Sequence, residues 1–389
     1  MWRLSNFLLE ATGISSAVTV CDFGFTSVLD LPSQGMMLSA RLLAFLLLVA
    51  SGAPAAQQPL PIPVRVVVVT MFEVGADTGD APGELQFWVE RDHLDRVFPL
   101  PSGFHAVRMN AEGEMAVLTG QGATHAAATV MAIGLDPRFD FTHAYWLIAG
   151  IAGGSPDHVS LGSAAWARWV VDGDLGYEVD GREIPNDWST GFLPLKKKTP
   201  FELPAEPMDG QVYALNAGLA QWAFNLTRGI KLHDSDELKE IRSHFDGAAA
   251  QRTPFVTMGD EISASTYWHG NLLDHWASKW MDYFTGGKGE FATAAMEDCG
   301  TLQSLEFLAR AGKVAAQRIM VLRTVSNFDR QPRGVTAADS LASQRVGSYS
   351  AYLPSLEAAY GVGHAVVNEL LTHWSRYKTT APAISQPAP

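Results

Sequence analysis

Residues 115–137, MAVLTGQGATHAAATVMAIGLDP, and residues 144–154, AYWLIAGIAGG, decide the fold. Each segment starts with a short apolar run that predicts a buried strand, and each run breaks into glycine. An alanine-rich segment typical of a helix lies between the two runs, and a third apolar run follows at 164–171. The order strand, glycine turn, helix, strand, glycine turn, strand predicts an α/β sheet whose strand ends form a ligand-binding crevice.

The glycine turns have two interpretations. Glycine lets the backbone adopt a positive φ and lets a ligand approach the main chain closely. The amide groups around Gly120 and Gly122, at the start of the predicted helix, are therefore candidates to hold an anion or a sugar hydroxyl. The alternative is that both turns need glycine for backbone geometry alone.

Composition limits the class of protein. The chain has 389 residues, 47% of them hydrophobic, which is enough for a sizeable core in one large domain or about two smaller ones. The net charge of −13 argues against a nucleic-acid partner, because phosphate binding depends on clustered lysine and arginine. The cysteines are Cys21 and Cys299, so the sequence predicts neither a disulfide framework nor a cysteine metal site.

Both ends of the chain are predicted to lie outside the folded domain. Residues 36–55 contain, in order, two methionines, an arginine, a short apolar run and the small residues Ala-Pro-Ala, which is the order of a secretory signal peptide. We expect residues 1–57 to be an upstream extension and signal peptide, with translation starting at Met36 or Met37 and a periplasmic or secreted mature protein. The Pro-, Ala- and Ser-containing residues 379–389 predict a disordered tail. No membrane span is expected after the signal, because no apolar run approaches ~20 residues.

Two further predicted strands end in polar residues. The β-branched run at 64–70 leads to Glu73, and ligands bind at the carboxyl ends of the strands in open α/β sheets. The run at 253–258 leads to residues 259–270, where hydroxyl and aromatic side chains suit a flat heterocycle. The alternatives are a solvated loop acid at Glu73 and an aromatic corner of the core at 259–270. The mixed segment 79–110 predicts a hairpin excursion.

Histidines give little support to a metal site. The candidate groups are His269 with His275, and His233 with Asp234 and Asp236. Neither spacing matches an established metal site. We therefore predict no metal and no cofactor.

Several short motifs resemble the nucleoside phosphorylase and nucleosidase superfamily. In chain order they are GQG at 120–122, AGIAGG at 149–154, GD at 259–260, AME at 295–297 and VSN at 325–327. Longer segments are similar to the purine nucleoside permease family, namely VTMFE at 69–73, IAGIAGG at 148–154, GSAAWAR at 162–168 and STYWHG at 265–270. The resemblance covers about residues 64–374.

This resemblance implies a fold and a ligand. The fold is a three-layer α/β sandwich with a central mixed, largely parallel sheet, formed by a single domain at residues 58–378, and the ligand is a purine nucleoside. The word permease fits the sequence poorly, because a membrane conduit needs spanning segments that the sequence does not predict. A homo-oligomer and a transport partner both stay open.

The resemblance also implies roles for individual residues. Met296 and Glu297 match a Met-Glu pair that holds the ribose hydroxyls, and a carboxylate that accepts two vicinal hydroxyls forms short, charge-assisted hydrogen bonds. The residues implied to contact the base or to pass along the nucleoside are Gly150, Ile151, Ile262, Tyr267 and Trp268.

The implied chemistry is cleavage of an N-glycosidic bond through an oxocarbenium-like state. Nucleosidases of the superfamily place an acid after the Ser of the Val-Ser strand end, and this chain has Asn327 there. An amide cannot deliver a proton, although it can hydrogen-bond a departing 6-oxopurine. The departure favours inosine or guanosine as substrate and leaves Asp329 as a reserve acid.

The residues that would hold a phosphate nucleophile are the second difference from the superfamily. Related phosphorylases follow the Gly-x-Gly with a phosphate-binding Ser and add arginines, whereas here Ala123 follows Gly122 and no Arg occurs from Thr70 to Glu90. Phosphate without a guanidinium partner is poorly held. Water is therefore the expected nucleophile, with Glu73 as general base.

A binding protein without chemistry is the alternative function. Such a receptor would deliver nucleosides to an importer, and Asn327 in place of an acid favours it. Glu73, Glu297 and the intact glycine turns favour the enzyme.

Overall fold

The computed structural model describes residues 59–344 and 349–382. The predicted signal peptide and residues 383–389 of the predicted tail lie outside the described residues. Residues from Leu60 onward form one compact unit, which is described below.

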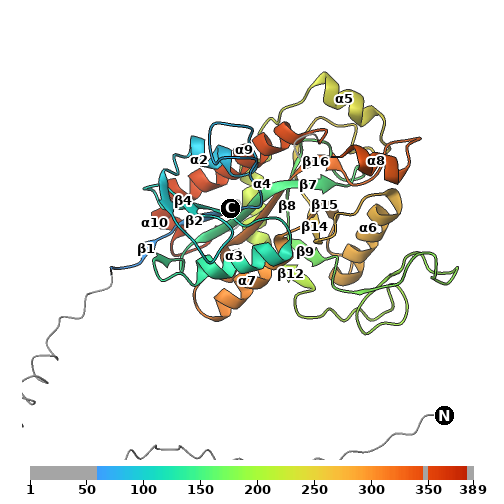
Figure 1. Ribbon diagram of the computed structural model, residues 1–389, viewed down its shortest axis with the longest axis horizontal. Coiled ribbons are helices and arrows are strands. Elements are labelled where there is room, and N and C mark those ends of the chain that lie inside the picture. Colours follow the sequence, from blue (N-terminus) through green and yellow to red (C-terminus); the bar gives the residue numbers. More distant parts are fainter. Residues whose placement is uncertain (1–58, 345–348, 383–389) are drawn as a thin grey trace, which may run out of the picture. The chain divides into compact units, whose positions relative to one another are not determined.

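A large mixed sheet forms the centre of the unit (Figure 1). Its strands are β2 (Val66–Thr70), β3 (Arg96–Phe98), β4 (Val107–Met109), β5 (Glu114–Leu118), β7 (Tyr145–Gly154), β8 (Ala164–Trp166), β9 (Trp169–Asp172), β12 (Val212–Ala214), β13 (Val256–Met258), β14 (Asp260–Ser263), β15 (Phe291–Ala295) and β16 (Ile319–Phe328). The main path runs β12-β9-β14-β15-β7-β2-β5-β4-β3, while β16 pairs with β7 and β8, and β8 pairs with β13. Separate two-stranded sheets join β1 (Ile62–Pro63) to β6 (Phe139–Asp140) and β10 (Tyr177–Glu178) to β11 (Phe192–Leu193).

The middle of the sheet is parallel. Strand β2 pairs in parallel with β5 and β7, and β7 pairs in parallel with β16. Antiparallel pairs β4–β5, β15–β7 and β16–β8 make the sheet mixed. Every residue of β2, four valines and a threonine, is buried, as expected for a central strand covered on both faces.

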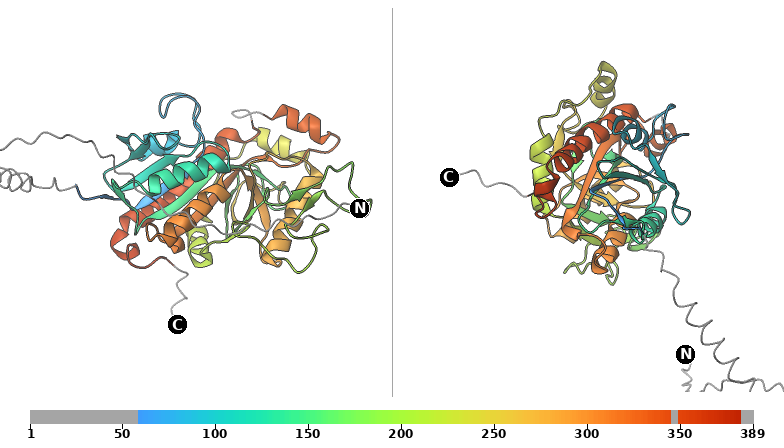
Figure 2. Two further views of the ribbon diagram at one scale, coloured as in Figure 1. Left: turned by 60° about the horizontal axis from the view of Figure 1, so that its bottom comes forward. Right: turned by 90° about the vertical axis from the view of Figure 1, so that its left-hand side faces the viewer.

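Helices cover both faces of this sheet. The helices of the described residues are α2 (Gln86–Arg91), α3 (Ala123–Gly134), α4 (Ala217–Thr227), α5 (Asp236–Ser243), α6 (Asn271–Thr285), α7 (Asp298–Arg310), α8 (Ala337–Ser343), α9 (Tyr352–Thr372) and α10 (Trp374–Tyr377), with a 3-10 turn at Ala316–Arg318. Figures 1 and 2 show α3 beside α7 on one face of the sheet, with α9 on the opposite face. Within the described ranges, no helix is long and apolar enough to cross a membrane.

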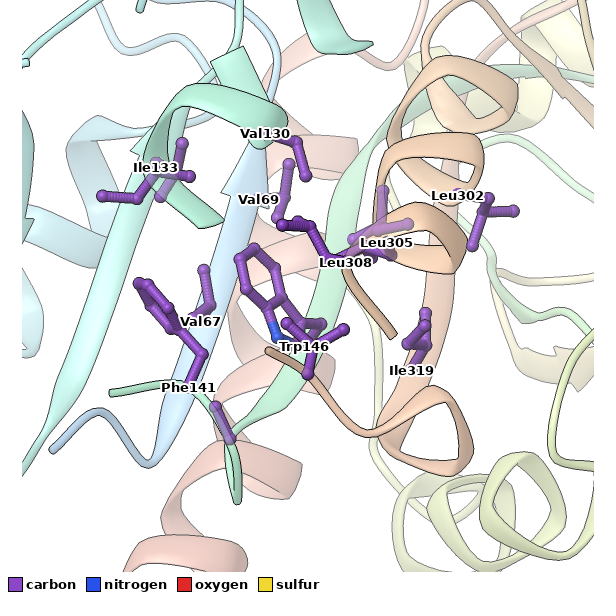
Figure 3. Packing of buried hydrophobic residues seen from close by; sticks show 14 of the residues in the cluster. Val67, Val69, Val130, Ile133, Phe141, Trp146, Leu302, Leu305, Leu308 and Ile319 are labelled. Atoms are coloured by element: carbon purple, nitrogen blue, oxygen red, sulfur yellow. The ribbon is translucent and has the colours of Figure 1, made fainter. Parts of the chain in front are cut away.

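Alternate residues of β2 enter two different core layers. Val67 and Val69 belong to the cluster packed under α3 and α7, whereas Val66 and Val68 belong to the cluster under α2, α4 and α9. Figure 3 shows side chains of α3 and α7 pointing toward those of Val67, Val69 and Trp146. The two layers follow from the two-residue period of a strand, and they confirm the predicted α/β class with helices on both faces of a central mixed sheet.

We expected the glycine segment 149–154 to end a strand. Instead, this segment continues β7 to Gly154. It stays extended because β16 pairs with β7 along this segment and β15 pairs with Gly153 and Gly154. The expected single strand at 164–171 is also divided, into β8 and β9. These strands have different neighbours, β13 and β16 for the first and β12 and β14 for the second.

The segment 79–110 is more than a hairpin. It contains the helix α2 before the antiparallel pair β3–β4. Leu85, Trp88 and Val89 are buried in the same cluster, and their spacing of three and four residues is that of one helix face. Glu84, two residues before this helix, lies beside the end of β2 and the C-terminal half of β7.

Candidate active site

A cavity of about 490 Å³ lies where β2, β7, β15 and β16 end. Its walls are Met71, Phe72, Glu84, Gln121, Ile151, Ala152, Gly153, Tyr267, Ala294, Ala295, Met296, Glu297, Ser326, Asn327 and Tyr349. A second cavity of about 310 Å³ shares six of these residues and adds Ala264, Thr266, Trp268 and Asp329. We call them the first and second cavities. Together they have the mixed apolar and polar lining of a small-molecule site.

Glu84 is the carboxylate that the sequence analysis missed. Its Oε2 accepts the Met71 N–H at 2.7 Å and its Oε1 accepts the Ile151 N–H at 2.7 Å, so it bridges the end of β2 and the C-terminal half of β7. The side chain lines the first cavity although the residue is only 6% exposed. Burial raises the pKa of Glu84 to about 8, Arg323 opposes this rise and Glu297 adds to it. A carboxyl with a pKa near neutrality is suited to proton transfer.

Glu73 lies elsewhere, at the start of α2. Its Oε2 accepts the N–H groups of Leu85 at 2.9 Å and Gln86 at 2.7 Å, and its Oε1 accepts those of Val74 and Gly83. The carboxylate therefore satisfies amides that the first turn of a helix leaves free. It does not appear in the walls of either cavity. This position differs from the expected one facing a ligand, because the chain turns back and brings Glu84 to the strand end instead.

Arg323 connects Glu84 to three other carboxyl groups. Its guanidinium, 1% exposed, contacts Asp298 and lies 3.5 Å from Glu297 Oε2 and 3.7 Å from Glu261 Oε2. Burial raises the pKa of Glu261 and of Glu297, and Arg323 opposes the rise at both. Since buried charges are costly unless they are paired, one guanidinium among four carboxyl groups favours protonation of some of them.

Glu297 also joins two loops. Together with Met296 it occupies the turn between β15 and α7, and both residues line the first cavity. Its Oε1 accepts the Gly122 N–H at 3.0 Å, while Ser265 Oγ accepts the Ala123 N–H at 3.1 Å. Two amides expected to hold a ligand anion are thus bonded to protein oxygens.

The two turn glycines take the positive φ that was expected, 83° at Gly120 and 88° at Gly122. A Cβ at Gly120 would lie 2.6 Å from the Phe104 ring, so this position also needs glycine for packing. Neither glycine lines the first cavity, but Gln121 between them does.

Asn327 lies in the wall shared by both cavities. Its Oδ1 accepts the Ser326 hydroxyl at 2.8 Å, and its Nδ2 donates to Tyr267 Oη at 3.0 Å. These partners fix the orientation of the amide and place Tyr267 beside it. Asp329 lines only the second cavity and is 3% exposed.

The remaining predicted base contacts fall into two groups. Ile151 lines the first cavity and Trp268 the second, whereas Gly150 and Ile262 line neither. Ile262 is fully buried in the core under α6 with Trp276, because the segment after Gly259 forms the unpredicted strand β14. Gly150 gives space instead, since a Cβ there would lie 2.4 Å from Glu84 Oε1.

Comparison with known proteins assigns the family. Residues 63–382 match the family model described as purine nucleoside permease (NUP). The chain belongs to the purine nucleoside permease family. The four longer motifs that carried the resemblance lie at the end of β2, in the C-terminal half of β7, around β8 and in the segment before α6.

Two curated relatives in this purine nucleoside permease family illustrate the match. The chain is 30% identical over 291 residues to a probable purine nucleoside permease of Schizosaccharomyces pombe, covering 72% of this chain and 81% of that protein. It is 30% identical over 268 residues to a purine nucleoside permease of Candida albicans, covering 68% of this chain and 65% of that protein. The chain thus spans just under two thirds of the length of the Candida protein.

Solved structures that resemble this purine nucleoside permease family member include two from Helicobacter pylori. One is a 5'-methylthioadenosine/S-adenosyl homocysteine nucleosidase, with 13% identity, a TM-score of 0.47 and coverage of 79% of this chain and 100% of that chain. The other is a futalosine hydrolase, with 12% identity, a TM-score of 0.46 and coverage of 79% and 99%.

No group of three or more His, Cys, Asp or Glu side chains in the described part of the chain is arranged to hold a metal ion.

Proposed function

We propose that the protein hydrolyses the N-glycosidic bond of purine nucleosides. In this proposal Met296 and Glu297 hold the ribose, and Asn327, Tyr267, Trp268 and the Ile151 backbone surround the purine. Glu84 activates the attacking water, a role that we expected for Glu73. The position of Glu84 carries the proposal, because its buried, cavity-lining carboxyl lies beside the proposed ribose site.

The charge of the first cavity supports water over phosphate. Its described walls include Glu84 and Glu297 but neither lysine nor arginine. The nearby Arg323 is held by Asp298 and by the Ile151 carbonyl at 3.3 Å. Phosphate dianions would therefore meet carboxyl groups without a free guanidinium, whereas water needs only a base within hydrogen-bond reach.

The second candidate function is a nucleoside receptor that supports transport. The family name favours it, and so does Asn327 at the position where nucleosidases of the superfamily place an acid. For either function we propose export to the periplasm or the medium, on the basis of the signal-like order of residues 36–55.

Product analysis tests the proposal. Purified protein given inosine in phosphate-free buffer should release hypoxanthine and free ribose, and added phosphate should change the rate little. Adenosine should react more slowly than inosine if Asn327 contacts the 6-position. Glu84→Gln serves as the matched inactive control.

Two outcomes contradict hydrolysis. Ribose 1-phosphate that forms only with phosphate would identify a phosphorylase. Inosine binding in calorimetry without product under either condition would identify a receptor.

A further inference from the structure

Two buried carboxyl groups beside the second cavity have no role in the function proposed above. Asp329 directly follows β16 and is 3% exposed, and Asp274 lies in the first turn of α6 and is 1% exposed. The backbone ties them together, because the Gly270 N–H donates to the Asp329 carbonyl at 2.8 Å and the Asp274 N–H donates to the Gly270 carbonyl at 2.9 Å.

Asp329 borders the same wall as Asn327. A Cβ placed on Gly153 would lie 3.5 Å from Asp329 Cβ and 3.7 Å from Asn327 Nδ2. Both side chains also line the second cavity, together with Tyr267 and Trp268. A purine held by Asn327 would therefore lie next to Asp329.

Three of the four carboxyl oxygens of this pair lack donors among the described residues. Arg330 Nη1 donates to Asp274 Oδ2 at 2.8 Å, and the same guanidinium holds Asp157. Asp274 Oδ1 and both Asp329 carboxyl oxygens have no hydrogen-bond partner among the described residues. Buried carboxyl oxygens without donors are costly, and a proton held between the two groups removes much of that cost.

The surrounding charges favour a protonated Asp329. Burial raises the pKa of Asp329 well above its ordinary value, Asp274 raises it further and Arg330 opposes the rise. The charged and titratable groups that face it are Asp274 from α6, Arg330 from its own segment and Tyr267 from the loop before α6. Two like charges this close do not both ionise readily.

We propose that Asp329 is the acid that protonates the departing purine, and that Asp274 holds it in its protonated form. The proposal rests on the nucleosidase function proposed above. As the C1'–N9 bond breaks, its electron pair moves into the purine, and a ring nitrogen takes the proton from the Asp329 carboxyl. Water adds to C1' and gives its proton to Glu84, and solvent restores both carboxyl groups. Asn327 then needs only to orient the base.

A substrate that needs no acid separates this role from a structural one. Nitrophenyl riboside releases nitrophenolate, a stable anion that leaves without protonation. Hypoxanthine is a poorer leaving group, so its departure is faster when an acid protonates it. Asp329→Asn should lower kcat on inosine by about 100-fold or more and leave nitrophenyl riboside cleavage within about threefold of wild type. Asp274→Asn should shift the basic limb of the inosine pH profile, because the acid loses its neighbour. Asp157→Asn, which neutralises the other carboxylate that Arg330 contacts and lies outside the described walls of both cavities, is the control and should change neither rate.

The failures can be told apart. Wild-type protein that cleaves neither substrate overturns the proposed function and this inference with it. A wild-type enzyme whose Asp329→Asn variant loses both activities equally, or neither, retains the proposed function but excludes Asp329 as the acid. A circular dichroism melt of each variant identifies any activity lost through unfolding. The Asp329→Glu variant keeps a carboxyl group, so it should retain part of the inosine rate, with the basic limb of its pH profile displaced. If this variant shows no such activity, the result also counts against the acid role.

Discussion

Glu73 and Glu84 are eleven positions apart in the chain but differ in what their carboxylates contact. The Glu73 oxygens are occupied by four backbone amides around α2, whereas Glu84 uses two amides and borders the first cavity. On this basis we propose that Glu73 contributes to stability and that Glu84 transfers protons.

Paired substitutions test this assignment. Glu84→Gln should lower kcat on inosine by ~10²–10⁴-fold, because an amide cannot act as a base. It should also cost about 1–3 kcal/mol of stability, because its NH2 group leaves either the Met71 N–H or the Ile151 N–H without an acceptor. Glu73→Gln should reduce the free energy of unfolding by about 1–3 kcal/mol, since the backbone amides lose a charged acceptor. Steady-state kinetics and denaturant unfolding measure the two effects. A Glu73 variant with normal stability and no activity would reverse the assignment.

At the scale of residues, short motifs pointed to several cavity residues, whereas Glu84 lies in none of the motifs and was missed. Met296, Glu297 and Asn327 were found from motifs, and all three line the first cavity. Glu84 was missed because 79–110 was interpreted as a hairpin. The spacing of Leu85, Trp88 and Val89 contains the helix signal that would have placed Glu84 at a helix start.

At the scale of elements, β7 is the strand on which the site depends. It remains extended through its glycines, and a Cβ at Gly150 would lie 2.4 Å from Glu84 Oε1 and 2.6 Å from Arg323 Nη1. Glycine here provides room for a buried carboxyl and a guanidinium rather than a turn.

Gly150→Ala should therefore displace Glu84 and destabilise the fold by about 1–3 kcal/mol, as overpacking does. Gly361→Ala is the matched control, because it lies in α9 with no atom within 4 Å of its added Cβ. Alanine is the better helix former, so the control should gain up to about 1 kcal/mol. Thermal unfolding of the two variants compares them. Equal effects would show that the space around Gly150 is not required.

Helices and strands with a clear local sequence pattern were predicted. Strands whose extent depends on pairing with neighbouring strands were not. The valine run gave β2 and the alanine-rich segment gave α3. Glycine normally weakens a strand interior, so the end of β7 is set by pairing with β15 and β16. Strand β14 is only four residues long and follows another short strand, so no period was available to reveal it.

For the whole molecule, buried carboxyl groups link stability to pH. The pKa of Glu84 is raised to about 8 by burial, and burial also raises the pKa of Glu114, Glu261 and Asp329. Below about pH 4.5 both the folded and unfolded chains hold these protons. As pH rises toward 8 the unfolded chain releases them first, so this contribution to stability is lost.

We expect Tm to be higher at pH 5.5 than at pH 8.5. A loss of about 3 kcal/mol, the order produced when one or two such groups must ionise, lowers Tm by about 5 °C in a domain of this size. Glu261→Gln should reduce the difference, and Glu183→Gln, at an exposed position, should not. Calorimetry at the two pH values measures it, and a Tm that rises with pH would contradict the raised pKa values.

The position of Arg323 in the chain bears on biosynthesis. The four carboxyl groups around it, Glu84, Glu261, Glu297 and Asp298, all precede it and leave the ribosome before it does. Strand β16, which carries Arg323 and Asn327, pairs with β7 on one side and with β8 on the other. A nascent chain lacking β16 therefore has a gap between those strands and lacks Arg323 beside its buried acids, so it can complete neither the sheet nor the first cavity. Insertion of this one late strand finishes both at once.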